Sequence, residues 1–203
     1  ASDFTAPVID GWSDSLKGAD VLKYNPEDAK KLWAQADAIS PWSGSFQIAY
    51  NSDGGHQGWV DAVTNSIKNT LGIDASGAPA PTFKQIRTTI TDRSIQTAFR
   101  TGWQFDFPSQ ANGLGPLYAT GSGSNDADYS SAEFDKYYDE GLSAQSQEEQ
   151  GQLFNKAQGV LFQDLPAIPL WYSSVTGGYS TLVGNVEFGW DSWPILYAVT
   201  KSE

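Results

Sequence analysis

Residues 46–72, FQIAYNSDGGHQGWVDAVTNSIKNTLG, carry the pattern that decides the fold class. At its start Phe46, Ile48 and Tyr50 occupy alternate positions, which predicts a half-buried strand. After a loop, large apolar residues recur at helical spacing, namely Val60, Val63, Ile67 and Leu71. Gly72 follows directly and favours the end of a helix there. The stretch therefore predicts a strand followed by an amphipathic helix.

The residues before this stretch predict another helix. In residues 25–28, NPED, asparagine is a preferred helix cap, proline fits the first turn, and two acidic residues face the positive end of the helix dipole. Ala29, Leu32, Trp33 and Ala36 then share one face. The order from residue 25 to residue 72 is thus helix, strand, helix.

The next fifty residues give weaker signals. Residues 75–81 are rich in Gly, Pro and Ala, which predicts a connector. We expect a short strand at 82–86, a short helix at 88–95 and a strand at 97–103. Residues 113–126 are rich in Gly and Ser and are expected to form a loop.

Two strong helices are predicted further on. Residues 130–133, SSAE, and 146–149, SQEE, are capping boxes, and apolar residues at helical spacing follow each. Residues 167–172, AIPLWY, resemble a strand that carries a proline and so lies at a sheet edge. Short β-type runs are expected at 179–183, 186–190 and 195–199. Interleaved helices and strands favour an α/β fold, and we expect one domain over residues 1–203.

Composition excludes several function classes. The formal net charge of −12 disfavours a nucleic-acid partner, and the absence of cysteine excludes thiol catalysis and Cys-ligated zinc. The single histidine, His56, precedes an amphipathic stretch and is interpreted as a surface residue near a helix start. No stretch of about 18 apolar residues is present, so no membrane span is expected. No cofactor motif, metal site or catalytic residue is predicted.

Five segments occur in an order that resembles one family. They are residues 24–32, YNPEDAKKL; 65–73, NSIKNTLGI; 102–108, GWQFDFP; 125–135, NDADYSSAEFD; and 153–172, LFNKAQGVLFQDLPAIPLWY. Together they are similar to the oligopeptide/dipeptide/nickel class of extracellular solute-binding proteins of ABC importers. The sequence departs from that pattern at Ser109, where the family usually has Asp.

The resemblance implies a fold and a mechanism. The chain would be the C-terminal lobe of a type II periplasmic-binding-protein fold, a mixed sheet flanked by helices, with the N-terminal lobe absent. Two lobes would close on a solute, which is then delivered unaltered to ABC permease subunits in the membrane. The implied protein is a monomer, extracellular or periplasmic, and anchored as a lipoprotein through an N-terminal region that this chain lacks.

The candidate ligand residues cluster around residues 100–107. The resemblance assigns Asp106 to the α-ammonium group of a bound peptide; otherwise Asp106 would cap the following turn. Arg100 is a candidate for a ligand carboxylate or for pairing with an acidic neighbour, and Trp103 for an apolar wall or for the core. Phe107 completes this group. Of Trp171 and Tyr172, one is expected to contact ligand, because strand neighbours face opposite sides.

Three alternatives remain open at this stage. The eight tryptophans suit an oligosaccharide ligand, since some members of the same family stack sugars on indoles. A glycoside hydrolase would need a carboxylate pair, but Asp135 with Asp139 and Glu148 with Glu149 are better explained as a solvated helix face and a helix cap. A surface adhesion domain would need no cleft.

Overall fold

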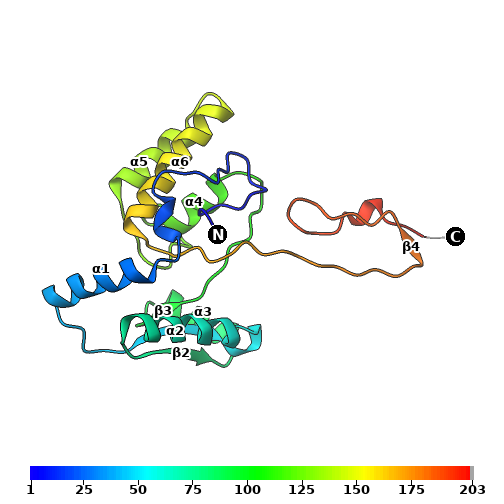
Figure 1. The fold of residues 1–203 in the computed structure, drawn as a ribbon. Coiled ribbons are helices and arrows are strands. Elements are labelled where there is room, and N and C mark those ends of the chain that lie inside the picture. The colour runs from blue at the N-terminus through cyan, green and yellow to red at the C-terminus, as the bar shows by residue number, and fades with distance from the viewer. Residues whose placement is uncertain (202–203) are drawn as a thin grey trace. The chain divides into compact units, whose positions relative to one another are not determined.

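The computed structural model describes residues 1–201, and the chain divides into two compact units. Unit 2 comprises residues 24–102, and unit 1 comprises residues 1–23 together with the chain from residue 103 onward (Figure 1). The sequence predicted that residues 1–203 form one domain, as a single lobe of a larger protein, and this stays a prediction. None of the helices in the described part is long and apolar enough to cross a membrane.

Unit 2 is built on a parallel sheet. Its strands are β1 (Phe46–Asn51), β2 (Ala75–Ala80) and β3 (Ala98–Phe99), in the order β2-β1-β3. Phe46 pairs with Ala75, and Ile48 pairs with Ala98, both in parallel register. The strand predicted around Ile48 is therefore the central one, which explains why its last four residues are buried regardless of the face they occupy.

Helices cover both faces of this sheet. α1 (Pro26–Ile39), α2 (Gln57–Leu71) and α3 (Phe83–Thr91) alternate with the strands along the chain. Side chains of successive strand residues point to opposite faces. Ile48 packs with Val60 of α2, whereas Ala49 packs with Ile86 of α3. The α/β class expected from the sequence is thereby confirmed in unit 2.

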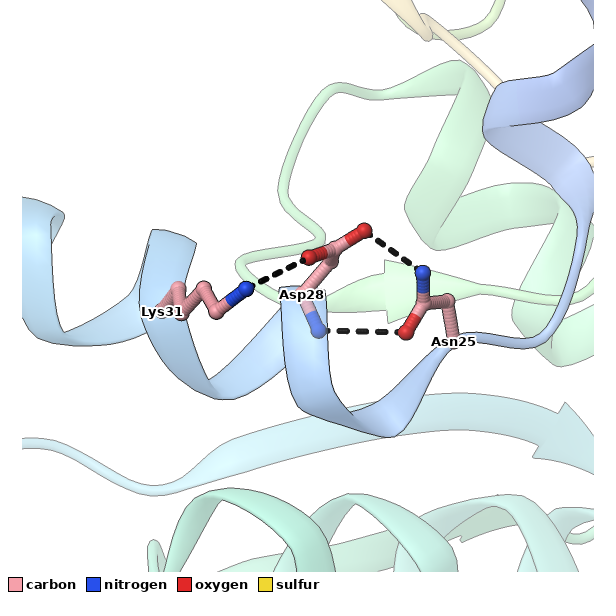
Figure 2. A network of polar contacts seen from close by, with 3 residues as sticks. All are labelled: Asn25, Asp28 and Lys31. Atoms are coloured by element: carbon pink, nitrogen blue, oxygen red, sulfur yellow. Dashed lines mark hydrogen bonds and ion pairs between the residues drawn. The ribbon is translucent and has the colours of Figure 1, made fainter.

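The start of α1 follows the sequence closely (Figure 2). The side-chain carbonyl of Asn25 accepts the backbone N–H of Asp28 at 3.2 Å, and the Asn25 amide donates to the Asp28 carboxylate at 2.5 Å. Lys31 forms an ion pair with the same carboxylate at 3.3 Å. This network pairs an orphan backbone donor of the first turn with a side chain, which is the physical basis of the asparagine signal.

Two predictions in unit 2 were wrong. Residues 75–81 are not a connector, because Ala75–Ala80 form β2; a Cβ at Gly77 would lie 2.8 Å from the Tyr50 ring, so a small residue is needed there. Residues 82–86 are not a strand but the cap and first turn of α3, where the Thr82 hydroxyl accepts the Gln85 N–H at 3.3 Å. Of the strand expected at 97–103, only Ala98–Phe99 form a strand, β3.

Unit 1 contains a bundle of three helices. They are α4 (Ala111–Tyr118), α5 (Ala132–Leu142) and α6 (Gln147–Asp164), and the short helix η1 (Ala19–Leu22) contacts α6. Ser131 and Ser146 cap α5 and α6 as predicted. The core of the bundle consists of buried apolar side chains: Leu114, Phe134, Phe154, Ala157, Val160 and Leu161.

The remaining predictions in unit 1 met mixed outcomes. The expected loop at 113–126 begins inside α4, which tolerates its glycines and Pro116 because it is short and largely buried. Residues 167–172 form no strand, since no neighbouring strand pairs with them. Of the predicted C-terminal runs, the described part contains β4 (Val183–Gly184) and β5 (Thr200–Lys201), which pair antiparallel, and η3 (Leu196–Ala198).

Candidate functional site

The carboxyl edge of the parallel sheet in unit 2 collects several polar side chains. In α/β folds ligands bind at this edge, because every parallel strand ends there and the loops that follow diverge. β1 ends at Asn51, and Arg100 follows β3 directly. The backbone N–H of Arg100 donates to the Ala49 carbonyl at 2.9 Å, so Arg100 is held in register with the central strand.

The Arg100 guanidinium has an aromatic neighbour rather than an acidic one. Its central carbon lies 5.7 Å from the centroid of the Phe83 ring, within the range of a cation–π contact. Burial lowers the pKa of Arg100. Within residues 1–201 it forms no ion pair. A half-buried guanidinium without a carboxylate is suited to an anionic partner from outside the unit.

Residues 51–56 place two further polar groups at the same edge. The Asn51 side chain is buried; its amide donates to the Asp53 carboxylate at 2.6 Å, while its carbonyl oxygen has no partner among the described residues. Asp53 also accepts the Phe83 N–H at 3.2 Å. The Asn51 bond lowers the pKa of Asp53, and the Phe83 N–H lowers it further.

His56 also belongs to the polar side chains at this edge of the sheet, and the sequence analysis did not predict that position. It precedes α2, as predicted, but it is half-buried and close enough to Arg100 for that charge to lower its pKa, in addition to the larger effect of burial. A histidine in a glycine-rich loop directly after a buried strand was the available signal.

The other candidate residues belong to unit 1 and lie in one short segment. Trp103 and Phe107 are 37% and 49% exposed. The backbone N–H of Asp106 donates to the side-chain carbonyl of Asn112, a buried residue of α4, at 2.8 Å. Asn112 therefore holds the backbone that carries the Asp106 carboxylate.

The carboxylate of Asp106 is exposed and has no partner within residues 1–201. The alternative in which Asp106 caps the following turn is not observed. That role is taken by Ser109, whose hydroxyl accepts the N–H of Ala111 at 3.3 Å. The departure from the family pattern at Ser109 thus coincides with the start of α4.

A close packing contact orients the segment that carries Trp103 and Asp106. A Cβ placed on Gly113 would lie 2.5 Å from Cζ of Phe105, so the Phe105 ring rests directly on the α4 backbone. Phe105 is half-buried, whereas its neighbours on either side are exposed. The ring anchors the segment and leaves Trp103, Asp106 and Phe107 facing solvent.

Trp171 and Tyr172 differ sharply although neither lies in a strand. Trp171 is 54% exposed. The Tyr172 hydroxyl accepts the backbone N–H groups of Ser2 and Asp3 at 3.2 and 3.0 Å, and lies 3.2 Å from the buried Asp3 carboxylate. Tyr172 is therefore engaged in holding the N-terminal segment, and Trp171 is the one of the two that faces solvent.

Five of the six candidate residues thus lie in unit 1, with Trp103, Asp106 and Phe107 in one segment, while Arg100 lies in unit 2, near its end. Among residues 1–201, no group of three or more His, Asp and Glu side chains is arranged to hold a metal ion.

Curated proteins with similar sequences share one description. The chain is 26% identical over 185 residues to the periplasmic oligopeptide-binding protein OppA of Salmonella typhimurium, a match that covers 85% of this chain and 32% of the relative. It is 28% identical over 148 residues to OppA of Haemophilus influenzae, covering 71% of this chain and 27% of the relative. The chain therefore spans about a third of the length of these relatives. No protein-family model matches it.

Solved structures share the fold. A peptide-binding protein of a peptide ABC transporter superimposes with a TM-score of 0.69 at 22% identity, over 83% of this chain and 76% of that one. HbpA2 of Haemophilus parasuis gives a TM-score of 0.76 at 17% identity, over all of this chain and 40% of that one. The pheromone receptor PrgZ gives 0.75 at 17% identity, over 90% and 35%.

These similarities confirm the resemblance predicted from the five sequence segments. They also confirm the α/β lobe of a type II periplasmic-binding-protein fold. The curated relatives are oligopeptide-binding proteins, the class that the resemblance predicted.

Proposed function

We propose that this chain is one lobe of a two-lobed protein that captures oligopeptides and delivers them to the permease of an ABC importer. The observation that carries the proposal is the similarity to oligopeptide-binding proteins over 85% of the chain. The chemistry of the candidate residues supports it, because, among the described residues, an unpartnered carboxylate and exposed aromatic rings in unit 1, and a guanidinium without a carboxylate in unit 2, are groups of the kinds that bind peptides.

Asp106 receives the α-ammonium group of the peptide. Its carboxylate is unengaged within residues 1–201, and Asn112 fixes its backbone, so little ordering is needed on binding. When the lobes close, water leaves the cleft and the charge-assisted hydrogen bond becomes short and directional. The net charge of −12 adds a general attraction for cationic groups.

Arg100 receives the peptide's terminal carboxylate. A guanidinium offers two parallel N–H groups that match the two oxygens of a carboxylate. The Phe83 ring contacts the Arg100 guanidinium without neutralising it, so the positive charge stays available.

The aromatic side chains form walls that accept many peptide sequences. Trp103, Phe107 and Trp171 are exposed and offer flat apolar surfaces, which bind varied side chains without a specific hydrogen bond. Tyr172 contributes by fixing the segment that carries Trp171.

The second lobe and the permease are further parts of this proposal. Large apolar side chains are exposed along residues 175–197: Val175, Tyr179, Leu182, Phe188, Trp190, Trp193, Leu196 and Tyr197. Such a concentration is typical of a surface that another part of the protein covers. We place the protein in the periplasm or outside the cell, tethered by an N-terminal anchor.

Mass spectrometry of the solute that co-purifies with the two-lobed protein tests the function. We expect short peptides of mixed sequence. The 203-residue chain alone is expected to bind such peptides only weakly in calorimetry, because a single lobe leaves the ligand exposed to water. Bound glycans, or submicromolar affinity of the single lobe, would contradict the proposal.

Replacing Arg100 with glutamine is expected to weaken binding of a free tripeptide about 10-fold or more, since one charged hydrogen-bond partner is lost. The variant should distinguish poorly between the tripeptide and its C-terminal amide, whereas the unmodified protein should prefer the free acid. Lys84→Gln removes the same charge from an exposed position on α3 and serves as the control. An equal effect of both substitutions would mean that only net charge matters.

A further inference from the structure

Residues 3–11 form a strap that packs on the helices of unit 1, drawn in dark blue in Figure 1. The centroid of the Phe4 ring lies 5.5 Å from that of Tyr118 in α4 and 5.3 Å from that of Phe162 in α6. The Phe4 N–H donates to the buried side chain of Gln158 at 2.9 Å. Three side chains of the strap are themselves buried: Asp3, Thr5 and Ile9. The strap therefore packs against the core of unit 1.

One end of the strap is held by Tyr172. The Tyr172 hydroxyl accepts the N–H of Asp3 at 3.0 Å and lies 3.1 Å from the carbonyl oxygen of the same residue. A hydroxyl has one proton and two lone pairs, so it can accept this N–H while it donates to the carbonyl oxygen or to the Asp3 carboxylate, 3.2 Å away. A single side chain thus pairs both backbone groups of Asp3, as a neighbouring strand would do.

The Asp3 carboxylate makes this end specific. It accepts the N–H and the hydroxyl of Thr5 at 2.6 and 3.2 Å, and within residues 1–201 it forms no ion pair. Burial raises the pKa of Asp3, and hydrogen bonds from Thr5, Tyr172 and the Ser13 backbone oppose that rise. A buried charge is costly unless it is hydrogen-bonded, so these donors must stay in place while the strap is docked.

The other end of the strap lies beside the segment that carries Asp106. Asp10 and Ser109 form an isolated parallel β-bridge, three residues after Asp106. The next residue of the strap, Gly11, has φ +81°, and a Cβ there would lie 2.8 Å from the side-chain nitrogen of Gln110 and 3.4 Å from the α6 backbone. Glycine is suited to this position because it adopts positive φ readily and has no Cβ to clash.

We propose that the strap is a positioning element that fixes both groups of candidate ligand residues in unit 1, through Tyr172 at one end and Ser109 at the other. Tyr172 directly follows Trp171, and Ser109 ends the segment that contains Trp103 and Phe107. One element therefore sets the separation between the two groups. Its effect on ligand binding rests on the proposed function, because rings that are already in place need little ordering when a peptide binds.

Fluorine NMR of the chain labelled with 5-fluorotryptophan tests the positioning without any ligand. The chain has eight tryptophans, and the variants Trp103→Phe and Trp171→Phe identify the two signals of interest. Asp3→Ala is expected to shift or broaden the Trp171 signal, because the donors around residue 3 lose their acceptor. Gly11→Ala is expected to shift or broaden the Trp103 signal, because the new Cβ pushes the strap away from Gln110.

Two variants serve as matched controls. Asp14→Ala removes the same charge from an exposed position. Gly121→Ala strains a backbone of similar conformation, φ +76°, where a Cβ meets nothing within 4 Å. Both should leave the two tryptophan signals unchanged. If Asp3→Ala does not fold, Tyr172→Phe removes only the hydroxyl and should shift the Trp171 signal in the same way. Unchanged signals in the strap variants, or equal shifts in the controls, would overturn the inference.

Peptide affinity of the two-lobed protein separates this inference from the proposed function. Asp3→Ala and Gly11→Ala should each weaken tripeptide binding about 3-fold or more, although the Asp3 side chain is buried beneath the strap. Shifted tryptophan signals in a protein that binds no peptide would contradict the proposed function and leave the positioning role intact. Unshifted signals in a protein that binds peptides would overturn the positioning role alone.

Discussion

Replacing Asp106 with asparagine is expected to lower the affinity of the two-lobed protein for a free tripeptide by about 30-fold or more. Losing one member of a buried charge pair costs about 2–5 kcal/mol, because the other charge is left desolvated and unpaired. The substitution preserves the size of the side chain, and the backbone bond from residue 106 to Asn112 remains possible. Isothermal titration calorimetry measures the change directly.

Chemical modification of the peptide provides the matching control for Asp106. N-acetylation removes the ammonium charge, so it should harm binding to the unmodified protein strongly and to Asp106→Asn only slightly; this non-additivity identifies the two groups as partners. Asp139→Asn, at an exposed position of α5, changes the net charge equally and should bind normally. If the losses from acetylation and from Asp106→Asn simply add, the ammonium binds elsewhere.

Replacing Phe134 with alanine is expected to destabilise unit 1 by about 3–5 kcal/mol, the usual cost of removing a fully buried aromatic ring. Phe134 is 0% exposed and is surrounded by the rings of Tyr118, Tyr129 and Tyr138 at centroid distances of 6.1–6.2 Å. The cavity would lie between α4, α5 and α6. Thermal unfolding followed by circular dichroism should show a midpoint lower by about 10 °C or more.

Leu142→Ala provides the comparison on the same helix. Leu142 is 53% exposed, so its truncation should cost well under half as much as that of Phe134. Because the chain has two compact units, the transition is best followed by tyrosine and tryptophan signals as well as by helix content. Equal midpoints for the two variants would show that the core of unit 1 is not centred on Phe134.

The elements predicted well are those whose signals are local. Asn25, Ser131 and Ser146 each accept a backbone N–H three residues later, and such a cap acts before any tertiary contact forms. The helical stripe that ends at Gly72 was equally clear, because Gly72 adopts the left-handed conformation that ends the helix.

The failed predictions concern segments that depend on neighbours. Residues 75–80, ASGAPA, have poor strand composition, yet they pair with the central strand along its whole length. Residues 167–172 have good strand composition but find no strand to pair with. In both segments the presence or absence of a neighbouring strand outweighs the intrinsic strand preference of the residues.

In the candidate site, too, local features were predicted from the sequence and contacts between distant residues were not. The sequence alone singled out the segment of Trp103, Asp106 and Phe107 through its resemblance to a binding-protein motif, and its residues are exposed in the structure. It did not reveal that Asn112 holds the Asp106 backbone, nor that His56 lies near Arg100, because these contacts join residues 6 and 44 positions apart.

The sequence by itself determined the fold class, the helix ends and the resemblance to solute-binding proteins, since caps, apolar spacing and short motifs are properties of single stretches of chain. Only the tertiary structure decided which segments become strands and which polar groups are free. A strand forms only beside a second strand whose backbone groups pair with its own. A polar side chain can be recognised as unpaired only when all of its neighbours in space are known. Both conditions arise from packing between distant residues, which one stretch of sequence does not encode.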